Sequence, residues 1–445
     1  MHGSDTSPSL AELPLALLFW GLICAYAAAF LVVPAVPLQD YPDWLYQSQV
    51  VKLKLEGDPA AADFAFKPYP VPYALHPLLL AGLMYLVEPL TAGKITAALS
   101  VLALGAGIAA FARAWDPAHA GSKALVLLPV LGLSVPFWLG YINFTFGFGL
   151  LLYLLGRDAC DRLGPLGLTV AALVMFFVHA VTLGGLALYL GWRHVVLRRD
   201  LGRLVALLPA AGLLCWYAYG RFVIDADPGL VVGADPGRGW LPAVWDYVKW
   251  KPVTLVQLGP YENFVTAGDQ GLLEGASVLH FHLGAVNVLF IAALLVAAFA
   301  GLARDAFAPA WNERLPPAML LVLAFLAAPP VNFLGLINIG ERLLLLALAP
   351  ILAWARPATA LTAVMVAVTL PLHGYNLWVV THIGPDSRPI IAAEPPLPGE
   401  HRVYGTPIAT RFGWHDKPGE RPLPALSPGY GTSILYETPR RGGMK

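Results

Sequence analysis

The sequence is organised around a short polar stretch, Val36-Pro37-Leu38-Gln39-Asp40-Tyr41-Pro42-Asp43-Trp44, which follows directly on the apolar run at 15–33. Two carboxylates and two prolines therefore lie where the sequence predicts that a first membrane helix leaves the bilayer. Asp40 stands two residues before Pro42, an order typical of an N-cap followed by a proline in the first helical turn. The stretch predicts the end of one helix and the start of another, with Asp40 between them.

The composition is that of an integral membrane protein. Of the 445 residues, 58% are hydrophobic and 13% are charged, and the mean hydropathy is +0.65, whereas soluble domains carry roughly 25% charged residues. The net charge is zero, which argues against nucleic acid as a partner. The three cysteines have no metal-ligand spacing and indicate no disulfide framework.

Apolar runs predict an all-α polytopic membrane protein with eleven transmembrane helices. The first is at 15–33, and the others are at 94–112, 124–139, 141–156, 164–179, 181–196, 204–219, 280–302, 315–329, 342–355 and 357–376. The segment 41–55 predicts an amphipathic helix on the membrane surface, with Trp44, Val51 and Leu55 on one face. The segment 57–75 is expected to be irregular, and the short apolar run 76–90 is expected to be a second surface or re-entrant helix.

Basic residues in the short loops predict the direction of the chain. Under the positive-inside rule, the cytoplasmic loops are those that carry Arg113, Lys123, Arg157, Arg162, Arg193, Arg198, Arg199, Arg203, Arg304, Arg314 and Arg356. With a cytoplasmic N-terminus, this parity requires that 76–90 does not cross. Residues 1–379 are then one transmembrane domain with outer loops at 35–93 and 220–279, and residues 380–445 are an irregular extension outside the membrane.

With this topology, polar side chains gather at the outer ends of the helices, and no charge lies at mid-bilayer. Ion-coupled carriers and pumps usually place charges near the midplane, so the pattern favours chemistry at one membrane face. The candidate site residues are Asp40, Asp43, Lys67, Asn143, His179, Glu341 and Arg342.

Several of these residues also have a purely structural interpretation. Asp40 is then an N-cap alone, and Asp43 complements the helix dipole in the first turn. Arg342 pairs with Glu341 or extends to lipid headgroups, and His179 is a hydrogen-bonded packing residue between two apolar helices.

Residues 15–355 resemble the GT-C glycosyltransferases, such as the protein O-mannosyltransferases and the lipid A aminoarabinose transferases. The resemblance consists of a first helix, an outer loop with an acid and surface helices, and six more spans before a large outer loop. Asp40 in Gln39-Asp40-Tyr41-Pro42-Asp43 matches the family's first-loop catalytic acid. Lys67-Pro68 matches a Lys-Pro pair that the aminoarabinose transferases carry near the donor phosphate.

Two further positions are compared with the same family. His179 falls where many members have a basic residue, and Asn143 stands where the turn between the third and fourth spans often holds a second acid. This departure leaves a divalent metal unsupported, so the expected metal ligands are none and the cofactor is unknown.

The resemblance implies a GT-C type glycosyltransferase, inverting at the anomeric centre, in the inner membrane of a bacterial cell. The donor is a polyprenyl-phosphate-linked sugar, and the acceptor is a glycan, lipid or protein at the periplasmic face, where the C-terminus also lies. Asp40 is the general base. Lys67, His179 and Arg342 are candidate cations for the donor phosphate, and Asn143, Asp43 and Glu341 are further substrate contacts.

Two other functions fit the same composition. A lipid or glycan flippase requires a path through the membrane and repeat symmetry, and the sequence has no clear internal repeat. A non-catalytic subunit of a membrane assembly would use the large outer loop and the C-terminal extension as docking surfaces. Alanine at Asp40, with unchanged expression and unchanged cell-surface glycan, would favour this last function.

Overall fold

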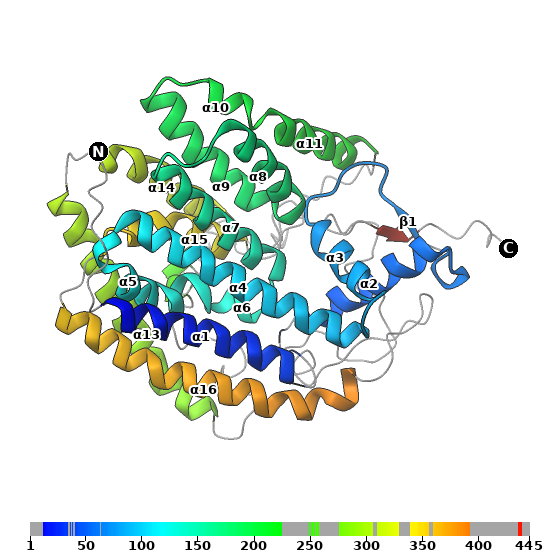
Figure 1. The fold of residues 1–445 in the computed structure, drawn as a ribbon, viewed down its shortest axis with the longest axis horizontal. Helices are drawn as coiled ribbons and strands as arrows, with labels where there is room; N and C mark the ends of the chain where they lie inside the picture. Colours follow the sequence, from blue (N-terminus) through cyan, green and yellow to red (C-terminus); the bar gives the residue numbers. More distant parts are fainter. Residues whose placement is uncertain are drawn as a thin grey trace, which may run out of the picture.

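The computed structural model describes most of the membrane domain and one short segment near the C-terminus. The described residues are 12–33, 36, 38, 41–62, 64–224, 248, 251–252, 254–256, 258, 276–305, 309–328, 339–355, 359–391 and 435–437. Within them the chain forms a bundle of helices, with a small group of elements around α2, α3 and β1 at one end (Figure 1).

The helices follow from apolar runs that are broken by proline, glycine and charged residues. They are α1 (Glu12–Val32), α2 (Tyr41–Glu56), α3 (Leu75–Leu83), α4 (Pro89–Trp115), α5 (Ala120–Leu127), α6 (Val135–Trp138), α7 (Ile142–Ala159), α8 (Pro165–Val178), α9 (Ala180–Leu190), α10 (Gly202–Val205), α11 (Leu208–Tyr219), α13 (Ala276–Arg304), α14 (Pro309–Ala327), α15 (Ile339–Leu352) and α16 (Thr359–Ile391). Short π-helical turns extend α5, α9 and α11 at Leu128–Gly132, Gly191–Leu197 and Gly220–Ile224. Single 3₁₀ turns lie at Pro59–Ala61 and Pro117–His119.

Five helical segments among the described residues are long and apolar enough to cross a membrane. They are Glu12–Val32, Pro89–Trp115, Ala180–Leu197, Val286–Arg304 and Thr359–Trp378. The protein is therefore a helical membrane protein, and this part of the predicted fold class is confirmed. Eleven spans remain a prediction.

One of the predicted spans is not a continuous helix. The predicted span 124–139 divides into α5, a π-helical turn and α6. Pro129 lies in the π-helical turn and Pro136 lies at the start of α6. Because proline lacks the N–H that a helix interior needs, the α-helical hydrogen bonding is interrupted at both places.

The predicted apolar segment 76–90 belongs to two helices. α3 has nine residues, and a helix of that length rises about 13.5 Å, which is less than half of a hydrocarbon core about 30 Å thick. The last residues of the segment begin α4 at Pro89. The length of α3 agrees with the expectation that 76–90 does not cross the membrane.

α2 packs one of its faces against the rest of the protein. Leu55 is 57% exposed, whereas Gln47 and Ser48 are buried beside Val50 and Val51. The reason is that α2 packs against α3 and the strand β1 (Phe64–Phe66), so its inner face is chosen by these neighbours. A helix lying alone on a membrane would have buried its most apolar stripe.

The segment 57–75 and the C-terminal extension are less irregular than predicted. β1 pairs antiparallel with β2 (Leu435–Glu437), with Phe64 opposite Glu437 and Phe66 opposite Leu435. In addition, α16 continues to Ile391, beyond the predicted end of the membrane domain at 379. A three-residue pairing between distant segments leaves no periodic pattern in the sequence, so local analysis did not detect it.

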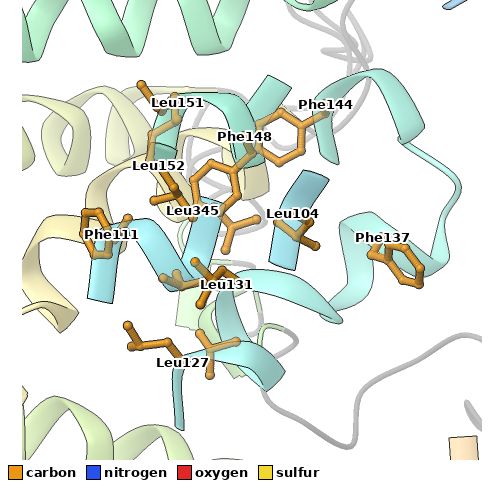
Figure 2. Close-up of a cluster of buried hydrophobic side chains, with 14 of the residues drawn as sticks. Leu104, Phe111, Leu127, Leu131, Phe137, Phe144, Phe148, Leu151, Leu152 and Leu345 are labelled. Atoms are coloured by element: carbon orange, nitrogen blue, oxygen red, sulfur yellow. The ribbon is translucent and has the colours of Figure 1, made fainter. Parts of the chain in front are cut away.

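The centre of the bundle is the close packing of α4 on α7. A Cβ on Gly149 would lie 2.7 Å from Leu104 Cα, and a Cβ on Gly107 would overlap the carbonyl oxygen of Gly149. Glycine at both positions lets the two backbones touch. Figure 2 shows the cluster beside this contact, in which Leu104 and Phe111 of α4 lie close to Phe148 of α7 and to a leucine of α15.

One end of the bundle, named here the loop-1 end, carries residues 33–88, which connect α1 to α4. Trp44 Nε1 of α2 donates a hydrogen bond to the Gly140 carbonyl oxygen in the turn before α7 (3.1 Å). Tyr41 donates its hydroxyl to the Leu90 carbonyl oxygen at the start of α4 (3.0 Å). The first loop is therefore fastened to the ends of the neighbouring helices.

The opposite end, named here the arginine end, is held by ion pairs around Asp158. The Asp158 carboxylate accepts hydrogen bonds from Arg193 Nη1 (2.5 Å), Arg203 Nη1 (2.8 Å) and His194 Nε2 (2.9 Å). Burial alone raises the pKa of the Asp158 carboxyl, but the hydrogen bond with His194 and the charge of Arg193 bring it below its usual value. Arg193 also pairs with Glu313 of α14 (3.4 Å), so the cluster joins α7, α10 and α14.

Loops that the topology predicts on one side of the membrane lie at the same end of the bundle. The first loop, the turn at Gly140 and the strand β2 are all at the loop-1 end. At the arginine end, the loops around Asp158 and Arg203 meet, and Glu12 accepts a hydrogen bond from the Ser122 N–H (2.8 Å). This grouping agrees with the predicted topology, and the assignment of the arginine end to the cytoplasm stays a prediction.

Candidate functional site

A proline-rich loop brings one lysine and two tyrosine side chains to the loop-1 end. It is Lys67-Pro68-Tyr69-Pro70-Val71-Pro72-Tyr73, between β1 and α3, and Lys67, Tyr69 and Tyr73 are all buried. Tyr73 has a φ of +77°, a left-handed conformation that is rare for a bulky residue and costs about 1–3 kcal/mol. The surrounding contacts hold the Tyr73 ring in one place despite this strain.

His179 is the first of those contacts. It forms the single-residue break between α8 and α9, with extended backbone angles, and it is 2% exposed. Its ring centroid lies 4.6 Å from the Tyr73 ring and 5.2 Å from the Phe144 ring, edge to face in both cases. Its Nδ1 atom is buried and has no hydrogen-bond partner within the described part of the chain.

Arg342 lies on the other side of Phe144. Its guanidinium carbon is 4.4 Å from the centroid of the Tyr141 ring and 5.9 Å from that of Phe144, and the residue is 8% exposed. Its Nε atom has no hydrogen-bond partner among the described residues. Aromatic faces stabilise a cation, but they leave the guanidinium N–H groups directed at other acceptors.

Glu341 does not cancel the charge of Arg342. Neighbouring residues on a helix do not face each other, and the buried Glu341 Oε2 has no hydrogen-bond partner in the described segments. Burial raises the pKa of the Glu341 carboxyl to about 7, and the charge of Arg342 opposes this rise. Near neutral pH the Glu341 carboxyl is therefore partly uncharged.

Asn143 lies in the first turn of α7, one turn before Gly147. A Cβ on Gly147 would be 3.1 Å from the Cβ of His179 and 2.7 Å from Thr182 Oγ1, so this face of α7 packs against the start of α9. Asn143 is 4% exposed, and neither Oδ1 nor Nδ2 has a hydrogen-bond partner among the residues described. A buried polar group without a partner costs about 1–3 kcal/mol, and a bound polar ligand would remove that cost.

Lys67 reaches the same cluster through aromatic rings. Its Nζ atom is 5.7 Å from the centroid of the Tyr69 ring, and that centroid is 6.1 Å from the ring of Tyr217 on α11. Burial raises the pKa of the Tyr73 hydroxyl, Tyr217 raises it further, and the charge of Arg342 lowers it. Tyr73 therefore lies within electrostatic reach of both Tyr217 and Arg342.

His179 is one of the three candidate cations for the donor phosphate, and that role stays a prediction. Its ring contacts the Tyr73 and Phe144 rings, and its Nδ1 has no partner among the described residues. An imidazole nitrogen exchanges hydrogen bonds with a polar ligand as a donor or as an acceptor.

The predicted general base is not among these contacts. Asp40 lies outside the described residues, and so does the side chain of Asp43, whose backbone is in the first turn of α2. The neighbours of Asp40 in sequence, Leu38 and Tyr41, are 3% and 1% exposed. Their backbones are linked by a hydrogen bond from the Tyr41 N–H to the Leu38 carbonyl oxygen (3.2 Å).

Sequence reasoning missed the aromatic residues that connect the site. Tyr73, Tyr141, Phe144 and Tyr217 are not among the candidate site residues that the sequence predicts. The alternation of proline with tyrosine in 67–73 was the available signal, since it predicts a rigid extended loop with defined side-chain directions. Within the described residues, no group of three or more histidine, cysteine and acidic side chains is placed to hold a metal ion.

Comparisons with known proteins add no family. No family model matches the chain, and neither a curated protein nor a solved structure matches it.

Proposed function

We propose that this protein is a membrane glycosyltransferase that uses a sugar linked to a polyprenyl phosphate. The observation that supports this most directly is Arg342, a buried cation at the head of an apolar helix, with an Nε that no described residue pairs. A guanidinium binds a phosphate through two parallel hydrogen bonds, and such contacts are strengthened where water is excluded. Lys67, beside the Tyr69 ring, supplies a second positive charge.

The polar side chains suit the sugar. Asn143 offers an amide whose donor and acceptor have no partner among the described residues, and His179 offers a buried imidazole nitrogen. Paired donors and acceptors of this kind recognise hydroxyl groups. Aromatic walls at Tyr73 and Phe144, which contact His179, provide the apolar faces that a sugar ring and the first part of a lipid tail require.

The proposed reaction is a single displacement. The acceptor hydroxyl attacks the anomeric carbon, and Asp40 removes its proton as the new glycosidic bond forms. The bond between the anomeric carbon and the phosphate oxygen breaks, and polyprenyl phosphate leaves with both electrons. Arg342 and Lys67 stabilise the negative charge on the leaving phosphate. The configuration at the anomeric carbon is inverted.

The proposed arrangement in the membrane has eleven spans, a cytoplasmic arginine end and a periplasmic loop-1 end in a bacterial inner membrane. It is supported by the clustering of Arg193 and Arg203 at one end, as the positive-inside rule expects. It is also supported by the location of the first loop and β2 at the same opposite end.

Cysteine labelling in intact cells is expected to confirm this orientation. After replacement of Cys24 and Cys215 by serine, a membrane-impermeant maleimide should label Asp235→Cys without permeabilisation, because residues 220–279 are proposed to be outside. The native Cys160, which is exposed beside the Asp158 cluster, is the matched internal site and should react only after permeabilisation. Labelling of Cys160 in intact cells would reverse the orientation and remove the periplasmic site.

Substitutions of Arg342 test the donor site. In a titration of purified protein with polyprenyl-phosphate-linked sugar, Arg342→Ala should raise the donor KM about 10- to 100-fold, the range for losing a charged hydrogen bond. Arg342→Lys should raise it about tenfold, because a point charge does not replace two parallel contacts.

Arg314 is the matched control for Arg342. Its guanidinium lies 3.8 Å from the Trp115 ring centroid, so it has the same kind of aromatic contact, but at the arginine end. Arg314→Lys should leave the donor KM unchanged. An unchanged donor KM in both Arg342 variants would make Arg342 a structural residue or a headgroup contact, and the phosphate would have to be sought at Lys67.

A further inference from the structure

The strand β2, near the C-terminal end of the sequence, lies beside the candidate donor site. It pairs with β1 in the first loop, where Ala65 is opposite Tyr436 and Phe66 is opposite Leu435. Lys67 follows β1 directly in the sequence, and its side chain is buried. Lys67, which is predicted to bind the donor phosphate, is therefore the residue directly after the strand that pairs with β2.

Within the described part of the chain, β1 packs into the protein through Phe64. Phe64 is 4% exposed and belongs to a small buried cluster with Val50, Val51 and Tyr69. Phe66, at the other end of the strand, is 38% exposed. The backbone groups along the edge of β1 are satisfied by β2, and two short strands are stable only with support from other elements.

The loop after β1 has little backbone hydrogen bonding of its own. Three of its seven residues, Pro68, Pro70 and Pro72, have no N–H to donate. Proline fixes the backbone angle φ, so the loop is stiff, and a stiff loop transmits the position of its first residue to the next. The place of Lys67 is therefore set by β1, and the place of β1 is set partly by β2.

We propose that β2 is a positioning element of the donor site, holding Lys67 where it binds the lipid-linked phosphate. This inference rests on the proposed function for the identity of the ligand, but the mechanical coupling from β2 to Lys67 does not. The C-terminal segment then acts inside the chain as an added strand, in the way that extended peptides complete a sheet edge in trans.

Removal of β2 and its return as a separate peptide tests the coupling. A variant that ends at Gly431 is purified, and a synthetic peptide of residues 431–445 is added back. The donor KM should rise about tenfold in the shortened variant with kcat changed less than twofold, and the peptide should restore the original KM. The same peptide with Tyr436→Pro, which removes a strand N–H, should not restore it.

A double-mutant cycle tests whether the effect of β2 on the donor KM depends on Lys67. If β2 acts through Lys67, the shortening should raise the donor KM of wild-type protein but leave that of Lys67→Met unchanged, because the receiving charge is already gone. Equal effects of the shortening in both backgrounds would overturn the proposal. An unchanged donor KM in the shortened protein would overturn it as well.

A readout without turnover separates this proposal from the proposed function. The rate at which an amine-reactive ester modifies Lys67, followed by mass spectrometry, should rise at least fivefold in the shortened variant and fall again with the peptide. Lys54, which donates to the Ala61 carbonyl oxygen (3.3 Å) outside β1, is the control lysine and should not change. If the full chain transfers no sugar but Lys67 responds in this way, the glycosyltransferase assignment fails and the coupling stands. If Lys67 does not respond, the coupling fails.

Discussion

Asp40→Asn is expected to lower the rate of sugar transfer by about 10²-fold or more, the usual effect of removing a positioned general base, while the protein still folds and inserts. Asparagine has nearly the same shape as aspartate and is an equally good N-cap. The asparagine amide cannot take up the proton of the acceptor hydroxyl at neutral pH. The substitution therefore separates the proposed role of Asp40 as general base from its predicted role as an N-cap.

The measurement is single-turnover transfer of labelled sugar at saturating donor, with protein amounts matched by chromatography. Asp58→Asn is the control, because Asp58 is an acid of the same loop that follows the other end of α2. It should transfer sugar at the wild-type rate. Wild-type transfer by Asp40→Asn would reduce Asp40 to an N-cap, and the general base would then be sought elsewhere at the loop-1 end.

Gly107→Val is expected to have the largest effect on folding. A Cβ at this position overlaps the carbonyl oxygen of Gly149, and a backbone atom in the middle of a helix cannot rotate away as a side chain does. The higher helix propensity of the residue that replaces glycine stabilises the helix by at most about 1 kcal/mol. Overpacking of this kind costs about 3 kcal/mol or more, so α4 and α7 must separate.

The fraction of protein that stays monodisperse after heating in detergent measures this effect, and it should fall at a much lower temperature than in wild-type protein. Gly184→Ala is the matched control, since a Cβ at Gly184 meets nothing within 4 Å. Its thermal stability should be equal to or slightly above that of wild-type protein. If Gly107→Val is as stable as the control, the backbone contact between α4 and α7 is not required for the fold.

Much of the fold follows from simple patterns in the sequence. The first helix was predicted at 15–33 and is found at Glu12–Val32, because a long apolar run that ends at Pro34 has few alternatives. Two loops were predicted on one side, one with Arg162 and the other with Arg203, and they meet at Asp158. Composition and charge are averaged over many residues, so these predictions tolerate local errors.

The part that differs from the prediction depends on a contact between distant segments. The C-terminal extension was expected to be irregular, yet it contributes β2. Its partner strand β1 lies in the first loop, far away in the sequence. No local pattern in the sequence predicts a pairing of this kind.

The pairing of β1 with β2 also has a consequence for biosynthesis. Leu435 and its partner Phe66 are roughly 370 residues apart in sequence. Because synthesis proceeds at about 5–20 residues per second, the edge of β1 stays unpaired for roughly 20 to 70 s before its partner strand is made. An unpaired strand edge is open to association with other chains, and Lys67 and Pro68 limit its length during this interval. Under the proposed role of β2, Lys67 therefore takes its final position among the last steps of synthesis, and a nascent chain released before Leu435 lacks the strand that positions it.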